Sequence, residues 1–107
     1  MIVSFQEKGL HDCSYVAAVA EERLGSVLAQ ALATLISEAE ATETAGELLE
    51  LRGPAAFVDS EDSLIVPIGA DCSARFVTVG HEFSRDEKGR TVWSSVRRLK
   101  LVALESA

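Results

Sequence analysis

The sequence predicts an α+β two-layer sandwich, a single domain over residues 1–107 in which a helical hairpin covers one face of a β-sheet. Two observations lead to this fold class. Apolar residues recur at helical spacing between residues 10 and 43, and from residue 63 onward the apolar period changes to two. With 107 residues, of which 48% are hydrophobic and 25% charged, the chain has the size and composition of one globular domain.

The N-terminal half is expected to contain one strand and two helices. The short apolar run from Ile2 to Phe5 predicts the first strand. A first helix is expected over residues 10–24, with Asp12 or Ser14 as its cap and Gly25 at its end. A second helix is expected over residues 26–43, on an apolar stripe made of Leu28, Leu32, Leu35, Ile36 and Ala39. Because the link is so short, we expect these helices to form an antiparallel hairpin.

The middle of the chain is expected to hold a short helical turn and a loop. Thr44 and Glu47 have the spacing of a capping box, which predicts a helical start at this point. The sequence Arg52-Gly53-Pro54 should end that turn, because proline cannot continue a helix. Residues 55–62, which include three acidic side chains, are expected to form an acidic loop.

The C-terminal half is expected to form a three-stranded antiparallel meander over residues 63–68, 74–79 and 94–105. Pro67 should lie at a sheet edge or at a bulge, and residues 69–72 should form a hairpin. Residues 80–92 are expected to form a charged loop that leads through Trp93 into the last strand. Regular alternation in the last strand would place three residues on the core face, namely Leu99, Leu101 and Ala103. The opposite face would carry Arg98, Lys100, Val102 and Leu104. The predicted order is β-α-α-β-β-β.

Charge and composition narrow the classes of function. The net charge is −7, distributed as −9 over residues 1–62 and +2 over residues 63–107, which is a weak basic signal for nucleic acid. No apolar run is long enough to span a membrane and no signal peptide is recognisable, so a cytoplasmic protein is expected. Cys13 and Cys72 are expected to be reduced, buried hydrophobes. The sequence has no cofactor-binding motif, and its two histidines, His11 and His81, lack the spacing of a metal site.

One group of side chains deserves consideration as a reaction site. Arg75, His81, Arg97, Arg98 and Lys100 come from predicted neighbouring strands and the loop between them. Fixed guanidinium groups could stabilise a phosphorane-like transition state, and a neutral imidazole could accept a proton from a 2′-hydroxyl. The alternative interpretation is a solvated strand face, on which the aliphatic stems of the basic residues cover apolar surface.

The whole pattern resembles the RelE/ParE superfamily of bacterial toxins, and most closely its HigB-like branch of plasmid maintenance killer proteins. The opening strand followed by Lys8-Gly9-Leu10, the Leu51-Arg52-Gly53 exit and the strand Ala74-Arg75-Phe76-Val77 are similar to that branch. The most specific likeness lies near the end of the chain, in Gly89, Trp93, Ser94, Val96, Leu99, Lys100, Leu101, Leu104 and Glu105.

The resemblance implies the toxin of a type II toxin–antitoxin pair, a ribosome-dependent mRNA endonuclease (mRNA interferase) restrained by a bound antitoxin of the helix-turn-helix type. Within it, Arg75 matches the arginine that contacts the scissile phosphate, with His81 as a stand-in base and Arg97, Arg98 and Lys100 as RNA-binding residues. The catalytic set is incomplete, because the basic loop before the second strand and the C-terminal His or Tyr of the family are absent.

Two other functions stay open at this point. A non-catalytic member of the same fold could bind a partner protein, with Val102 and Leu104 receiving an amphipathic helix. A ParE-like inhibitor of DNA gyrase would need no RNA chemistry. A homodimer is compatible with each of these functions.

Overall fold

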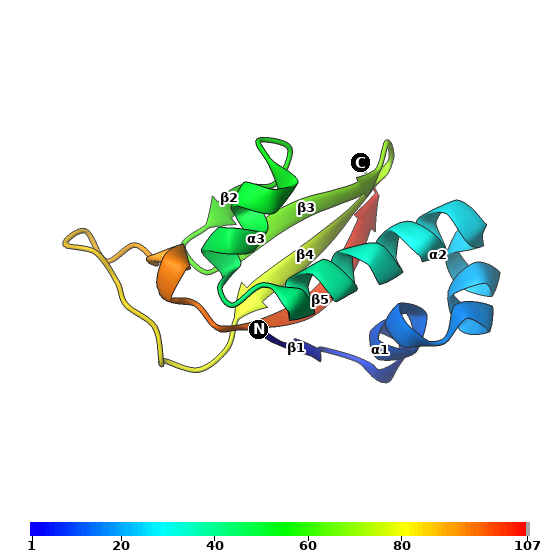
Figure 1. Cartoon of the computed structure of the whole chain (residues 1–107), viewed down its shortest axis with the longest axis horizontal. Helices are drawn as coiled ribbons and strands as arrows, with labels where there is room; N and C mark the ends of the chain where they lie inside the picture. The colour runs from blue at the N-terminus through cyan, green and yellow to red at the C-terminus, as the bar shows by residue number, and fades with distance from the viewer. Residues whose placement is uncertain (107) are drawn as a thin grey trace.

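The computed structural model of the chain describes residues 1–106 and has an α+β architecture (Figure 1). Three α-helices, one 3₁₀ turn and five strands follow one another in the order β1 (Ile2–Phe5), α1 (Lys8–Tyr15), α2 (Ala17–Ala41), α3 (Ala45–Arg52), β2 (Phe57–Ser60), β3 (Ser63–Gly69), β4 (Cys72–Thr78), η1 (Trp93–Ser95) and β5 (Arg98–Ser106). The predicted α+β class is therefore confirmed, whereas the predicted order β-α-α-β-β-β lacks one strand and one helix.

The first predicted helix is divided into two. α1 begins at Lys8, and its N-cap residue, Glu7, makes no side-chain capping bond, so neither Asp12 nor Ser14 caps the helix. The Ser14 hydroxyl instead donates to the carbonyl of Leu10 at 2.9 Å, inside the helix. Val16 has an extended backbone and separates α1 from α2. Gly25 then bends α2 sharply with φ = +80°, a conformation that glycine adopts without steric cost.

α3 begins at the predicted capping box. The Thr44 hydroxyl accepts a hydrogen bond from the Glu47 backbone N–H at 3.2 Å, and the Glu47 carboxylate accepts from the N–H of Glu43 at 2.9 Å. A Cβ at Gly46 would lie 3.0 Å from the Cα of Ser94, so glycine permits α3 to approach the η1 turn closely. These contacts connect the middle of the chain to the segment that precedes β5.

The sheet has the strand order β1-β5-β4-β3-β2. β1 runs parallel to β5, while all other neighbours are antiparallel. The segment predicted as an acidic loop over residues 55–62 contains β2, an exposed edge strand, so that prediction was wrong. Pro67 lies beyond the part of β3 that pairs with β2, next to a register shift before Gly69, as the bulge prediction required.

The last strand departs from regular alternation. It begins at Arg98, after the η1 turn, whereas residues 94–105 were predicted. Phe76 pairs with Leu101 but Arg75 pairs with Ala103, so Val102 is the extra residue of a β-bulge. The bulge places Ala103 on the face opposite Leu101 and turns Leu104 toward the core, which reverses the facing predicted for both residues.

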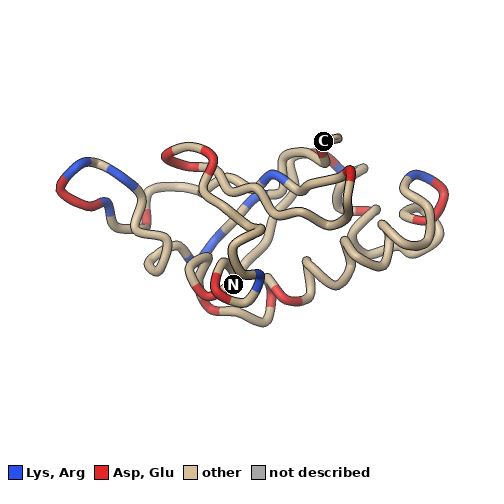
Figure 2. Tube along the Cα trace, turned by 90° about the horizontal axis from the view of Figure 1, so that it is seen from above, with Lys and Arg blue, Asp and Glu red and all other residues tan. Residues whose placement is uncertain are grey.

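The core lies between the helices and one face of the sheet (Figures 1 and 2). Its largest fully buried side chains are Phe76, Leu32, Leu35, Ile36, Leu48, Leu64, Leu99 and Leu101. Both cysteines are free thiols, as predicted; Cys13 is buried, but Cys72 is only half-buried, so the predicted burial was wrong for Cys72. Trp93 packs partly against the core at η1. No helix within residues 1–106 is long and apolar enough to cross a membrane.

Candidate functional site on the outer sheet face

The face of the sheet turned away from the helices carries most of the basic residues singled out above. We call it the outer face. Its side chains form four cross-strand rows, which are Pro67, Ser73 and Glu105; then Phe57, Ile65, Arg75 and Ala103; then Ser63, Val77, Lys100 and Ser4; and last Arg98 and Ile2. Phe57 and Ile2, at opposite edges of the sheet, are 48% and 59% exposed. The outer face is therefore a mixed apolar and charged surface.

Arg75 lies in the second row and is held by two carboxylates. Its Nε donates to both carboxylate oxygens of Glu105, at 3.1 Å each, and its Nη2 lies 3.1 Å from Oε1 of the same group. Its Nη1 donates to Asp59 Oδ2 at 2.7 Å and to the Ser63 hydroxyl at 3.3 Å. The guanidinium is thus fixed in orientation, with its side chain 28% exposed.

These contacts decide the charge of the site. Hydrogen bonds to Glu105 and then to Asp59 raise the pKa of Arg75 above its ordinary value, so the guanidinium stays protonated at every physiological pH. One cation against two carboxylates leaves this end of the outer face with a net charge of about −1. A phosphate approaching Arg75 would have to compete with both carboxylates.

The other end of the outer face is basic. Arg98 is exposed and Lys100 is half-buried, and neither side chain makes a hydrogen bond or ion pair with any other residue in the 1–106 range. Arg97 precedes β5 and is also exposed. Arg97 and Arg98 line a cavity of about 250 Å³ together with one carboxylate, that of Glu82, and with the apolar residues Ile2, Val79, Phe83 and Val96. The sheet therefore brings Arg75, Arg98 and Lys100 to one face, with Arg97 at its end.

His81 is not part of this arrangement. It is exposed in the segment that follows β4, and across the described chain its ring makes no hydrogen bond. The polar partners of Arg75 are carboxylates and a hydroxyl, not an imidazole. Among residues 1–106, no three His, Cys, Asp or Glu side chains lie where they could hold a metal ion. The structure thus gives Arg75 an electrostatic role without a general base fixed beside it.

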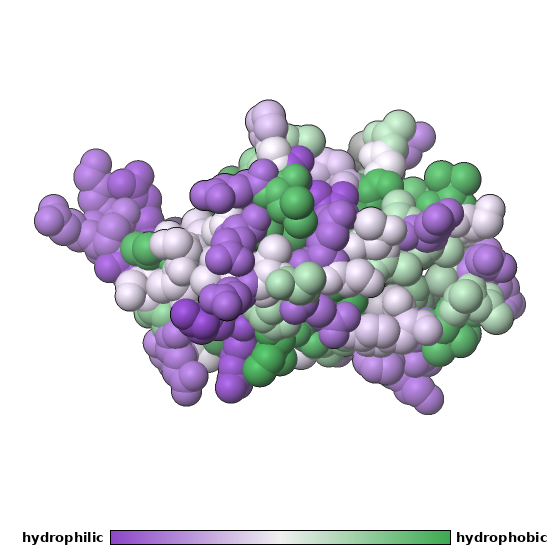
Figure 3. Space-filling view, in the orientation of Figure 1, coloured by the Kyte–Doolittle hydropathy of each residue, from purple (hydrophilic) through white to green (hydrophobic). Residues whose placement is uncertain are grey.

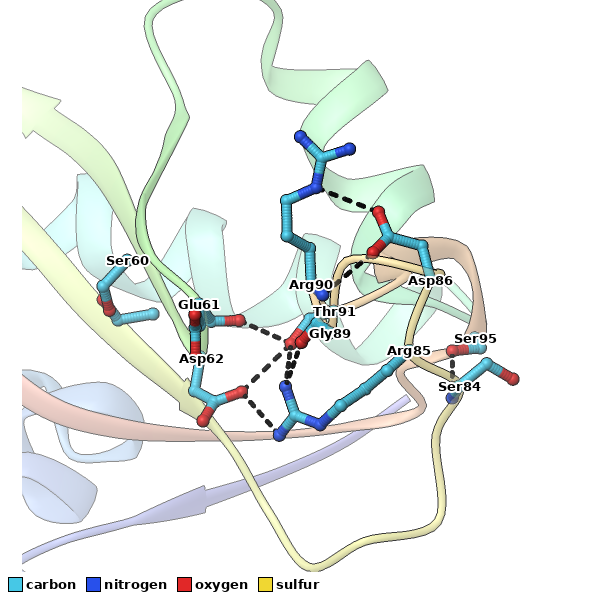
Figure 4. Close-up of polar contacts among 11 residues, drawn as sticks. Ser60, Glu61, Asp62, Ser84, Arg85, Asp86, Gly89, Arg90, Thr91 and Ser95 are labelled. Carbon is cyan, nitrogen blue, oxygen red and sulfur yellow. Dashed lines mark hydrogen bonds and ion pairs between the residues drawn. The ribbon is translucent and has the colours of Figure 1, made fainter.

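A second polar network lies outside the outer face, in the projecting segment 84–92, which we call the finger (Figures 3 and 4). Arg85 donates to Asp62 Oδ1 at 3.2 Å and to the Thr91 hydroxyl at 3.3 Å. Thr91 donates to the same Asp62 oxygen at 3.0 Å. At the tip, Asp86 accepts backbone hydrogen bonds from Lys88 and Arg90, at 2.9 Å each. The network fastens the finger to the β2–β3 turn and occupies Arg85 and Arg90.

The sequence did not reveal the two partners of Arg75. Glu105 would face the core if β5 alternated regularly from Leu101, and only the bulge at Val102 brings it beside Arg75. The sequence predicted a loop at Asp59, but this residue lies in β2, where the register shift between Val58 and Ser60 leaves it without a partner on β3. An acidic side chain within an apolar segment such as Phe57–Val58–Asp59 was the available signal.

Comparison with known proteins adds no relative. No family model matches the sequence, and neither the curated proteins nor the solved structures contain a significant match. The interpretation of the site therefore depends on its own geometry and on the resemblance noted in the sequence.

Proposed function

We propose that the chain is the toxin component of a bacterial type II toxin–antitoxin system, a member of the HigB-like branch of the RelE/ParE superfamily that cleaves mRNA on the ribosome. The observation that carries the proposal is the sharing of one uncovered sheet face by Arg75, Arg98 and Lys100. A sheet face that carries several cations is suited to a phosphodiester backbone, since phosphate contacts supply most of the affinity for RNA.

In the proposed reaction, the roles follow from the positions of these residues. The guanidinium of Arg75 would stabilise the charge that develops on the scissile phosphate. Lys100, which is the diagonal neighbour of Arg75 across β4 and β5, and Arg98 would hold the flanking phosphates. His81 is given no role here, because it lies outside this arrangement and the polar partners of Arg75 include no imidazole. A bound antitoxin of the helix-turn-helix type would restrain the activity.

The test is expression from a tightly controlled promoter, followed by mapping of mRNA 5′ ends by primer extension. We expect growth arrest and new mRNA ends, both abolished in Arg75→Ala and weakened in Lys100→Ala. Lys88→Ala, which removes an exposed cation of the finger, is the matched control and should act like the unaltered protein. Normal growth with intact transcripts would refute the nuclease function.

A second function is favoured by one specific observation, the neutralisation of Arg75 by Glu105 and Asp59. A guanidinium engaged by two carboxylates suits a non-catalytic member of the same fold, which binds a partner protein. In that case expression would leave mRNA intact, while the product of the adjacent gene would co-purify with the chain. A supercoiling assay would identify the ParE-like alternative, inhibition of DNA gyrase.

A further inference from the structure

The outer face has a net negative charge over its first two rows and a positive charge over its last two, with apolar side chains among the charged ones. At one end, Glu105 and Asp59 outnumber the single cation Arg75. In the last two rows, Arg98 and Lys100 form no ion pair within the described residues, and Glu82 lines the same cavity as Arg98. Val77 and Ala103 lie in the two middle rows. Such a surface is complementary to itself when it is turned end for end.

We propose that the outer face is an interface between two copies of this chain. The two copies are related by a two-fold axis that lies midway between the sheet of one copy and the sheet of the other, and that is perpendicular to the strands. Such an axis passes between the row of Ala103 and the row of Val77, so that the first row of one copy faces the fourth row of the other. Glu105 of each copy then faces Arg98 of the other. The second and third rows form the centre of the interface, where Ala103 and Val77 lie beside Arg75 and Lys100.

The dimensions of the face agree with a weak but specific dimer. Seven residue steps separate Arg98 from Glu105 along β5, which corresponds to about 23 Å, and five strands span about 19 Å between their outermost axes. A face of this size presents on the order of 500 Å² per copy, below the roughly 800 Å² of a standard interface. We therefore expect a reversible dimer with a dissociation constant on the order of 10 μM.

The charge of Arg75 does not oppose this arrangement. Its guanidinium is already saturated by Glu105, Asp59 and Ser63 of its own chain, so it enters the interface without an unpaired charge. Lys100, in the third row, faces the second row of the other copy, one row away from that copy's Glu105. The inference does not depend on the proposed nuclease activity. In such a dimer, Arg75 and Lys100 would be inaccessible to RNA.

The experiment is sedimentation velocity of the full chain between about 5 and 500 μM, a range that brackets the expected dissociation constant. We expect a shift from monomer to dimer that moves to higher concentration in about 1 M NaCl, because salt screens the end-to-end attraction. Arg98→Glu should raise the dissociation constant at least about tenfold, since the two-fold symmetry repeats each repulsive contact. Lys88→Glu makes the same change of charge on the finger and should leave the dimer unchanged.

A mixing experiment distinguishes this interface from other modes of self-association. Arg98→Glu and Glu105→Arg should each be monomeric, because both variants place like charges opposite one another in their own dimers. An equimolar mixture of the two should recover the dimer, since both cross-pairs are again of opposite sign. Circular dichroism of each variant checks the fold, and Lys100→Glu replaces Glu105→Arg in the dilution series if the latter unfolds. A monomer at every concentration, a dimer insensitive to Arg98→Glu, or a folded mixture that stays monomeric would each overturn the proposal.

Discussion

The bulge at Val102 predicts the relative cost of two neighbouring substitutions. With the bulge, Leu104 packs against the core and Ala103 faces outward beside Arg75. Leu104 is half-buried, and full burial of a leucine contributes roughly 1.5 to 3 kcal/mol, so Leu104→Ala should lower the free energy of unfolding by about 1 to 2 kcal/mol. Ala103→Ser should change it by less than about 0.5 kcal/mol, because an outward hydroxyl keeps contact with water.

Without the bulge, the order of the two costs would be reversed. Ala103 would be buried, so a serine hydroxyl there would cost about 1 to 3 kcal/mol, while Leu104→Ala on the open face would cost little. Urea denaturation followed by fluorescence of Trp93, the single tryptophan, measures both variants. For a domain of this size, about 1 kcal/mol corresponds to roughly 4 to 8 °C in the melting temperature. A larger loss for Ala103→Ser than for Leu104→Ala would refute the register, and with it the pairing of Glu105 with Arg75.

Three further predictions concern the elements that support the site. Thr44→Ala removes the capping bond to Glu47 and should destabilise the fold by about 1 kcal/mol in thermal melts, whereas Thr44→Ser should not. Gly46→Val would force a side chain against the backbone of Ser94 and should cost about 1 to 3 kcal/mol by urea titration. Backbone N–H donors lower the pKa of Asp86, so its stabilisation of the finger is complete above about pH 4 and is lost as the pH falls through the lowered value. Amide exchange in the finger, corrected for its intrinsic rate, should therefore accelerate in acid, and Asp86→Asn should remove that dependence.

Several elements could be read from local sequence, because their causes lie within a few residues. The capping box at Thr44, the glycine stop at Gly25 and the hairpin after Gly69 each depend on the backbone preferences of adjacent residues. Alternation places Arg75 on the face opposite Ala74 and Phe76 for the same reason. The break at Val16 left no comparable signal, since neither glycine nor proline occurs there.

The site shows where local reasoning ends. The sequence by itself determined the α+β class and most of the helical and strand segments that form the core, because apolar period and turn residues act at short range. Only the tertiary structure decided what Arg75 touches. One extra residue at Val102 moves Glu105 across the sheet, and the pairing of β2 brings Asp59 to the same guanidinium. Register between strands distant in sequence is set by packing of the whole sheet, and a shift of one residue changes every face beyond it.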